Sequence, residues 1–261
     1  MSEPAKISLQ DWHAQPHHLW VVLPAYNEEG SLGPLLEALL WELDSDFRDF
    51  TILVVNDGST DRTAAIVRSY ESTGRVRLID QPANRGLAET LRTGLLEAVR
   101  QSGPEDTVVV MDADNSHPAG LIFRMTRRIR EGNDVVIASR YREGSQIRGL
   151  KLHRRLLSNG ASWLFRVVFP TPGVRDYTCG YRAYRAGLLR QLMDKHGQDF
   201  ISERGFACMV DLLLRLREMG AIFSEVPLVL RYDRKEGASK MKVSRTIKET
   251  LFLMFRRSLG W

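Results

Sequence analysis

Two aspartates, Asp112 and Asp114, have the type and spacing that most directly indicate chemistry in this 261-residue chain. They follow the apolar stretch 107–111 (TVVVM), which is typical of a buried strand. In an extended segment, residues two apart point to one face, and neighbouring acids repel unless a cation lies between them. Mg²⁺ commonly binds one or two carboxylates together with substrate phosphates. The pair therefore predicts a metal site that holds a diphosphate. The alternative is that Asp114 caps the next helix and Asp112 completes a turn.

Polar strings follow each of the predicted strands. In chain order they are PAYNEE (24–29), NDGSTD (56–61), NRG (84–86), DADNSHP (112–118) and SRY (139–141). Each string alone is typical of a turn. Ligands of open α/β sheets, however, bind at the carboxyl ends of the strands. Five polar strings in that position predict one shared binding site.

The elements that position these strings alternate between apolar strands and amphipathic helices. Strands are predicted at 19–24, 50–55, 76–80, 107–111 and 134–139, and helices at 31–43, 61–70, 87–101 and 121–131. Continuous Val, Ile and Leu runs separated by helices indicate a parallel sheet covered on both faces. The fold class is therefore α/β, with a doubly wound first half. The second half contains a basic amphipathic stretch (150–169), a helix (206–219) and a strand pair or edge strand (222–230).

Composition and missing motifs exclude several classes of protein. Hydrophobic residues make up 43% of the chain and charged residues 26%, which is ordinary for a soluble globular protein, and no apolar run is long enough to span a membrane. The two cysteines lack metal-ligand spacing, and no signal peptide precedes them, so we expect reduced thiols in a cytoplasmic protein.

The formal charge of +5 fits an anionic ligand or an anionic membrane surface rather than nucleic acid. Without GxGxxG after the first strand, GxxxxGK[ST] or GxSxG, a dinucleotide enzyme, a P-loop ATPase and a serine hydrolase are disfavoured.

The ordered set of motifs resembles the GT-A fold glycosyltransferases of family 2, and among them the polyprenyl- or dolichyl-phosphate mannose synthases. The motifs are PAYNEE, VVNDGSTD, NRG, VVVMDAD followed by HP, ASRY, DYTCGYRAYR, EVP and GASK. The resemblance implies one GT-A domain at 19–240. A Rossmann-like nucleotide-sugar half (19–140) with a mostly parallel sheet would precede an acceptor half (141–240). We also expect a loose arm at 1–18 and an amphipathic helix at 241–261.

The resemblance also implies roles for individual residues. Asp112 and Asp114 would bind Mg²⁺ or Mn²⁺, and Arg140 and Arg154 would hold an acceptor phosphate. The residues that would bind the nucleotide sugar, besides the acid pair, are Pro24, Tyr26, Glu28, Asp57, Arg85, Gly86, Arg234, Ser239 and Lys240.

The chain departs from the family pattern at two positions. Asn56 stands where many relatives carry a second Asp, and Ser116 stands where the mannose synthase subgroup can carry a Gln that contacts the metal. Two of the assigned cations also have plainer interpretations: Arg154 could lie on a solvated helix face, and Lys240 could be a lysine at a helix start.

These roles imply an inverting, metal-dependent transfer of mannose from GDP-mannose to a polyprenyl or dolichyl phosphate. A phosphate acceptor is already an anion and needs no base, so Asp211 would then be structural or would orient a neighbouring residue. The alternative is transfer from a UDP-sugar to a hydroxyl, with Asp211 as the catalytic base. A third hypothesis, a nucleotide-sugar-binding module without catalysis, is disfavoured by the acid pair and by the basic loop that contains Arg234, Ser239 and Lys240.

Two stretches, 150–169 and 241–261, combine basic residues with an apolar face and predict contact with a membrane surface. A helix of this kind fits the interface of an anionic leaflet. We therefore expect peripheral contact with the cytoplasmic membrane face, directly or through a membrane-bound partner subunit. For 241–261 the alternative is a helix packed on the catalytic domain with its basic residues in solvent.

Overall fold

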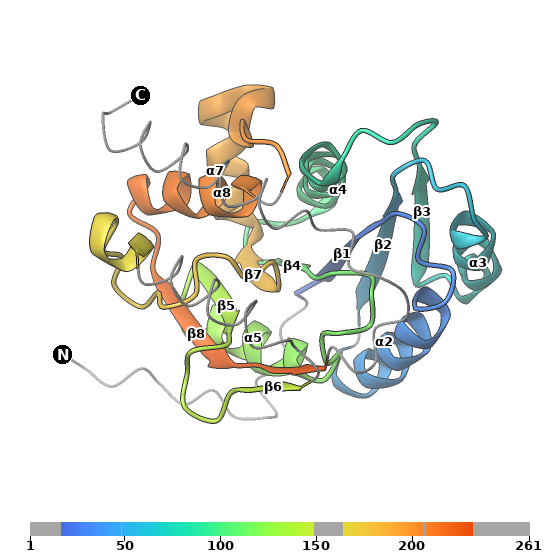
Figure 1. Cartoon of the computed structure of the whole chain (residues 1–261), viewed down its shortest axis with the longest axis horizontal. Helices are drawn as coiled ribbons and strands as arrows, with labels where there is room; N and C mark the ends of the chain where they lie inside the picture. The colour runs from blue at the N-terminus through green and yellow to red at the C-terminus, as the bar shows by residue number, and fades with distance from the viewer. Residues whose placement is uncertain (1–16, 48, 149–163, 206, 232–261) are drawn as a thin grey trace.

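The computed structural model describes residues 17–47, 49–148, 164–205 and 207–231 (Figure 1). Most of the arm predicted at 1–18 and the whole of the helix predicted at 241–261 lie outside these residues. The same holds for four of the candidate site residues, which are Arg154, Arg234, Ser239 and Lys240. Within the described part of the chain, no helix is both long enough and apolar enough to cross a membrane.

A seven-stranded sheet in the order β3-β2-β1-β4-β7-β5-β8 forms the centre of the molecule. Its strands are β1 (Leu19–Ala25), β2 (Phe50–Asn56), β3 (Val76–Asp80), β4 (Thr107–Val110), β5 (Val135–Ser139), β7 (Arg182–Arg185) and β8 (Phe223–Pro227). β7 runs antiparallel to its neighbours β4 and β5, and the other pairs are parallel. A small parallel pair, β6 (Gln146–Arg148) with β9 (Val229–Arg231), lies beside the main sheet.

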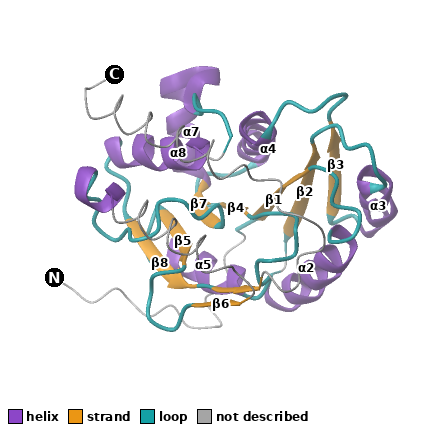
Figure 2. Ribbon diagram, viewed as in Figure 1, coloured by secondary structure: helices purple, strands orange, loops and turns teal. Residues whose placement is uncertain are grey.

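Helices cover both faces of the sheet, as Figure 2 shows, with α4, α7 and α8 on one side and α2 and α5 on the other. Their bounds are α2 (Leu32–Asp46), α3 (Thr63–Tyr70), α4 (Leu87–Gln101), α5 (Leu121–Arg130), α7 (Ala186–His196) and α8 (Ala207–Glu218). Short 3-10 turns at Glu71–Thr73 and Gly197–Phe200 follow α3 and α7. Because both faces are covered, every residue of β2, β4 and β5 is buried.

Close packing of α4 on the sheet depends on Gly94. A Cβ at this position would lie 2.4 Å from Cγ1 of Val22 and 3.0 Å from Cγ2 of Val55. These are shorter than side-chain contacts normally reach, so the glycine lets α4 approach β1 and β2. This close packing positions β1 and β2, and the polar loops follow the carboxyl ends of these strands.

Candidate functional site

The loops that follow β1 and β2 are joined by hydrogen bonds. The backbone N–H of Asn27 donates to Oγ of Ser59 (2.9 Å), and that of Glu28 donates to Oγ1 of Thr63 (2.8 Å). Oδ1 of Asn27 in turn accepts from the backbone N–H of Thr60 (2.8 Å). Asn27 adopts a left-handed backbone, with φ of 52°, which Asn tolerates better than most residues. The predicted site residues on the first loop, which are Pro24, Tyr26 and Glu28, are all half-buried.

Asp57 connects the loop after β2 to the loop after β3. Its buried carboxylate accepts from the backbone N–H groups of Arg85 (Oδ1, 2.7 Å) and Gly86 (Oδ2, 3.0 Å). At Gly58 a Cβ would lie 2.4 Å from the carbonyl carbon of Ala83, so a glycine is needed where the loops cross. The structure thus brings together Asp57, Arg85 and Gly86, three of the predicted site residues, and the side chain of Arg85 is exposed.

Asn56 shows why this chain departs from a second aspartate at that position. Its Nδ2 donates to Oδ1 of Asp80 (2.7 Å), and its Oδ1 accepts from the backbone N–H (3.3 Å) and the hydroxyl (2.5 Å) of Ser59. The residue is 2% exposed. An aspartate here would place a buried carboxylate against the carboxylate of Asp80, and like charges repel.

The acid pair lies directly after β4. Asp112 is half-buried and Asp114 is 6% exposed. Oδ1 of Asp114 accepts from the backbone N–H (3.1 Å) and the hydroxyl (2.6 Å) of Ser116, so Ser116 orients the carboxylate. The backbone N–H of Asp112 donates to Nδ1 of His117 (3.3 Å), and the His117 ring stacks on Tyr181 at 4.9 Å.

The chemistry of the acid pair fits a hard divalent cation. Among the described residues, no group of three or more His, Cys, Asp and Glu side chains could hold a metal ion. Two carboxylates would therefore leave the remaining coordination positions to water and phosphate oxygens, as Mg²⁺ commonly requires. A Cβ at Gly180 would lie 3.5 Å from Oδ1 of Asp112, so the segment before β7 borders the pair.

The end of β9 is attached to the loop between β4 and α5 (111–120), which contains the acid pair and is called the acid loop below. The backbone N–H of Arg231 donates to the carbonyl oxygen of Ser116 (3.0 Å). The segment 232–240, which contains Arg234, Ser239 and Lys240, starts at the next residue. The last described residue before this segment is therefore hydrogen-bonded to the acid loop.

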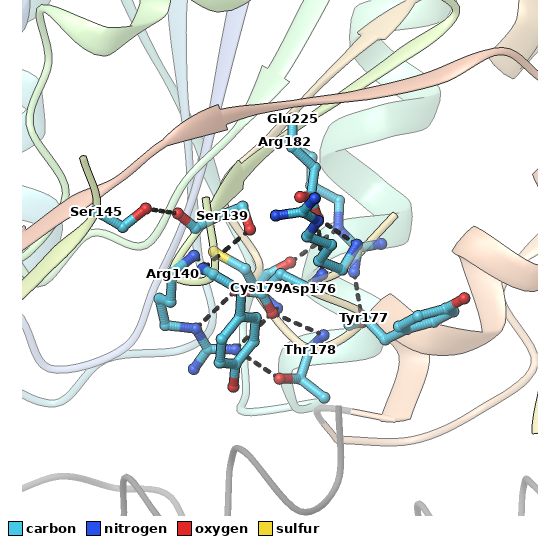
Figure 3. Close-up of polar contacts among 11 residues, drawn as sticks. Ser139, Arg140, Ser145, Asp176, Tyr177, Thr178, Cys179, Arg182 and Glu225 are labelled. Atoms are coloured by element: carbon cyan, nitrogen blue, oxygen red, sulfur yellow. Dashed lines mark hydrogen bonds and ion pairs between the residues drawn. The ribbon is translucent and has the colours of Figure 1, made fainter. Parts of the chain in front are cut away.

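Arg140 is held by the carboxylate of Asp176, for which the sequence motifs predicted no role. Figure 3 shows its guanidinium against Asp176, with Nε donating to Oδ2 (2.8 Å) and Nη2 to Oδ1 (2.6 Å), while Nη2 also donates to Oγ1 of Thr178 (2.7 Å). Asp176 is fully buried. Burial alone would lower the pKa of Arg140, but the charge and hydrogen bonds of Asp176 outweigh it and raise that pKa. Burial acts in the opposite sense on Asp176, and the charge of Arg140 and its hydrogen bonds bring the pKa of Asp176 below its usual range.

A second buried acid, Glu225 of β8, holds the same segment. Its Oε1 accepts from the backbone N–H groups of Arg175 (2.6 Å) and Asp176 (2.7 Å). Burial raises the pKa of Glu225. Arg140, Asp176 and Glu225 thus form one buried polar unit. Both acids stand in motifs of the sequence, since Asp176 begins DYTCGYRAYR and Glu225 begins EVP, but the motifs do not indicate their contacts.

Asp211 lies in α8 and is completely buried. Its Oδ2 accepts from the backbone N–H (3.0 Å) and the hydroxyl (3.0 Å) of Ser202 and from Nε of Arg215 (3.2 Å). This carboxylate therefore joins the 3-10 turn region after α7 to α8.

Both cysteines are buried free thiols. Burial raises the pKa of Cys179 and of Cys208 to about 12. The prediction that both are small core residues is confirmed.

Comparisons with known proteins identify the class of fold and of enzyme. Residues 20–193 match the family described as "Glycosyl transferase family 2". A polyprenol monophosphomannose synthase from Mycolicibacterium smegmatis is 31% identical over 89% of this chain and 83% of its own length. A dolichol-phosphate mannosyltransferase from Pyrococcus furiosus is 30% identical over 90% of this chain, which spans only 62% of that relative.

Solved structures agree on the fold. A crystal structure of glucosyl-3-phosphoglycerate synthase from Mycobacterium tuberculosis, in complex with Mn²⁺, UDP and phosphoglyceric acid, matches with a TM-score of 0.65. The match covers 97% of this chain and 84% of that one at 20% identity. A structure of the same enzyme with Mg²⁺ and UDP matches with a TM-score of 0.63 at the same identity, over 97% of this chain and 85% of that one.

The architecture is thus that of the GT-A-like glycosyltransferases, an α/β fold with a mostly parallel sheet. The chain belongs to glycosyl transferase family 2 and is a glycosyltransferase.

Proposed function

We propose that this enzyme transfers mannose from GDP-mannose to a polyprenyl phosphate, with inversion at the anomeric carbon. The observation that carries the proposal is the position of Asp112 and Asp114 after β4, at the sheet edge where the loops of β1, β2 and β3 are joined by hydrogen bonds. The sugar and the lipid phosphate are inferred from the names of the two relatives at 30–31% identity.

The donor would lie across the joined loops. Pro24, Tyr26 and Glu28 would border the base, with Asp57 fixing the wall that Arg85 and Gly86 form. Asp112 and Asp114 would hold Mg²⁺ or Mn²⁺, and a bound divalent cation neutralises charge on a leaving diphosphate. Asp114 is oriented for this role by Ser116, which takes the place of the subgroup's glutamine.

The residues Arg234, Ser239 and Lys240 would cover the donor diphosphate. The attachment of Arg231 to Ser116 supports this, because segment 232–240 then begins at the acid loop. A basic loop that closes over a diphosphate also excludes water from the reaction.

A phosphate acceptor is favoured over a hydroxyl by the contacts of Asp211. This carboxylate is buried and already accepts from Ser202 and Arg215, whereas a general base must reach the proton it removes. Arg154 is our candidate for direct contact with the acceptor phosphate. Arg140 would contribute from a fixed position, since Asp176 and Thr178 engage its Nε and Nη2.

Transfer to a hydroxyl from a UDP-sugar is the second candidate function. It is favoured by the fold likeness to a glucosyl-3-phosphoglycerate synthase that was crystallised with UDP. Asp211 would then be the catalytic base.

We further propose that the enzyme contacts the membrane from the cytoplasmic side, through the basic stretches 150–169 and 241–261 or through a membrane-bound partner. The Lys and Arg residues of these stretches would be attracted to an anionic leaflet by roughly 1 kcal/mol each.

A donor panel tests the proposal. The enzyme is incubated with GDP-mannose, UDP-glucose or other nucleotide sugars. Each donor is combined with a short polyprenyl phosphate, with a hydroxyl acceptor or with no acceptor, and the products are separated by mass. We expect a mannosylated polyprenyl phosphate when GDP-mannose is the donor, and no such product from the other nucleotide sugars. Transfer only from a UDP-sugar, and only to a hydroxyl acceptor, would instead establish the second candidate function.

A further inference from the structure

A cavity of about 600 Å³ lies on the α5 side of the sheet, apart from the candidate donor site. It is bordered by α5, by the residues after β5, by Arg175 and by the carboxyl end of β8, and Figure 1 shows α5 beside β5. Of the residues proposed above for the donor, the metal or the acceptor, none that the structure describes lines it.

Arginines dominate the walls of this cavity. Among the described residues, five arginines and three glutamates line it. Two of the arginines, Arg127 and Arg128, already have a partner, because both pair with Glu131 at 3.1 Å. A second acid, Glu225, uses Oε1 to accept from backbone N–H groups.

The positive charges of the other three arginines are not paired with a described acidic side chain. Arg124 of α5, Arg142 after β5 and Arg175 before β7 are exposed at the cavity, and their side chains form no ion pair or hydrogen bond with any described residue. The remaining acid, Glu143, pairs with none of them. Three unpaired guanidinium groups from three separate segments, facing one cavity, are held together only at an energetic cost, because like charges repel.

We propose that this cavity is a second anion site, which binds a phosphate-bearing ligand through Arg124, Arg142 and Arg175. Guanidinium groups donate paired hydrogen bonds to phosphate oxygens, and a cavity of this size accommodates a phosphate or diphosphate together with part of the group that carries it. The ligand is either a free phosphorylated molecule or the headgroup of an anionic lipid.

The site is also connected to the buried polar unit. Arg175 precedes Asp176, and Glu225 accepts from the backbone N–H groups of both. An anion bound at Arg175 would therefore contact the segment that holds Arg140.

Inorganic pyrophosphate and vesicles are the probes that test this site. Pyrophosphate is titrated into the full chain in EDTA, and the amide NMR signals of Arg128, Arg142 and Val226 are followed. Vesicles of phosphatidylcholine, with and without phosphatidylglycerol, are used for flotation.

The test variant carries Arg124→Gln, Arg142→Gln and Arg175→Gln. The control carries Arg77→Gln, Arg100→Gln and Lys195→Gln, which removes the same charge from surfaces away from the cavity. Thermal unfolding checks that both variants fold.

Two results would support the site. Pyrophosphate should shift these amide signals in the wild type and control, with an affinity more than about tenfold weaker in the test variant, since each lost charged hydrogen bond weakens binding by about that factor or more. Loss of flotation on phosphatidylglycerol vesicles by the test variant alone would identify a lipid headgroup as the source, and unchanged flotation with the amide shifts present would identify a free phosphate ligand. The proposal is overturned if wild type shows neither response, or if the test variant and control respond equally.

Discussion

Arg140 and the fully buried Asp176 form a bidentate ion pair, with Nε to Oδ2 at 2.8 Å and Nη2 to Oδ1 at 2.6 Å. This pair fixes the end of β5 to the segment before β7. Removing one partner leaves an unpaired charge inside the protein. Such losses cost about 3–5 kcal/mol. The pair therefore stabilises the protein around the candidate site.

Asp176→Asn should therefore destabilise the protein by about 3–5 kcal/mol, as measured by urea unfolding at pH 7. The effect should fade in acid. The pKa of Asp176 is lowered in the folded state, so its ionised form stabilises the fold above the unfolded pKa of about 3.9. That contribution is lost as the pH falls through the lower folded value. An unfolding free energy that differs from wild type by the same amount at pH 7 and in strong acid would contradict this account.

Glu225→Gln should show the opposite pH dependence. Burial raises the pKa of Glu225 above its unfolded value of about 4.3. Wild-type stability from this group is therefore full below that unfolded value and falls as the pH rises through the folded one. The unfolding free energy of Glu225→Gln relative to wild type should rise between pH 4 and neutrality. Glu218→Gln, at the exposed end of α8, is the control, and an equal rise in both variants would count against the assignment.

The thiols of Cys179 and Cys208 should not react with a disulfide reagent in the native protein at pH 8. Both are buried, and a pKa of about 12 leaves almost no thiolate at that pH. In denaturant both should react at once, which a chromogenic thiol assay measures. Rapid labelling of the native enzyme would show that one of them is accessible.

Asp211→Asn should distinguish the two acceptor classes. With a phosphate acceptor the change should lower kcat by only a few-fold, because no proton has to be removed. With a hydroxyl acceptor the loss of a general base should cost about 10²–10⁴-fold. Donor binding, followed by tryptophan fluorescence, and thermal unfolding must be measured alongside, because Asp211 also holds Ser202 and Arg215.

The sequence predicted the nucleotide half of the fold closely. β3 and α4 have the predicted bounds, and β1, β2, β4 and β5 lie within one residue of theirs. These elements are either continuous apolar runs or regular amphipathic helices, so periodicity identifies them directly. The α/β class and the mostly parallel sheet are confirmed.

The second half was harder to predict because its signals depend on tertiary contacts. β7 was missed since its sequence, RAYR, reads as polar. Arg182 is nevertheless completely buried, because its guanidinium donates to the carbonyl oxygens of Cys179, Met209 and Tyr177. α7 and the short strand β6 were also missed. The partner of Arg140 could not be found from spacing either, because Asp176 lies 36 residues away in the sequence.

The measurement that tests the central claim most directly is the initial rate of mannose transfer from GDP-mannose to a short polyprenyl phosphate. We predict turnover with Mg²⁺ or Mn²⁺ and none in EDTA. Asp112→Asn and Asp114→Asn should each lose about 10²–10⁴-fold in rate, while Arg77→Gln on the outer surface should be unchanged. Full activity in chelator, or wild-type rates in both aspartate variants, would contradict the account.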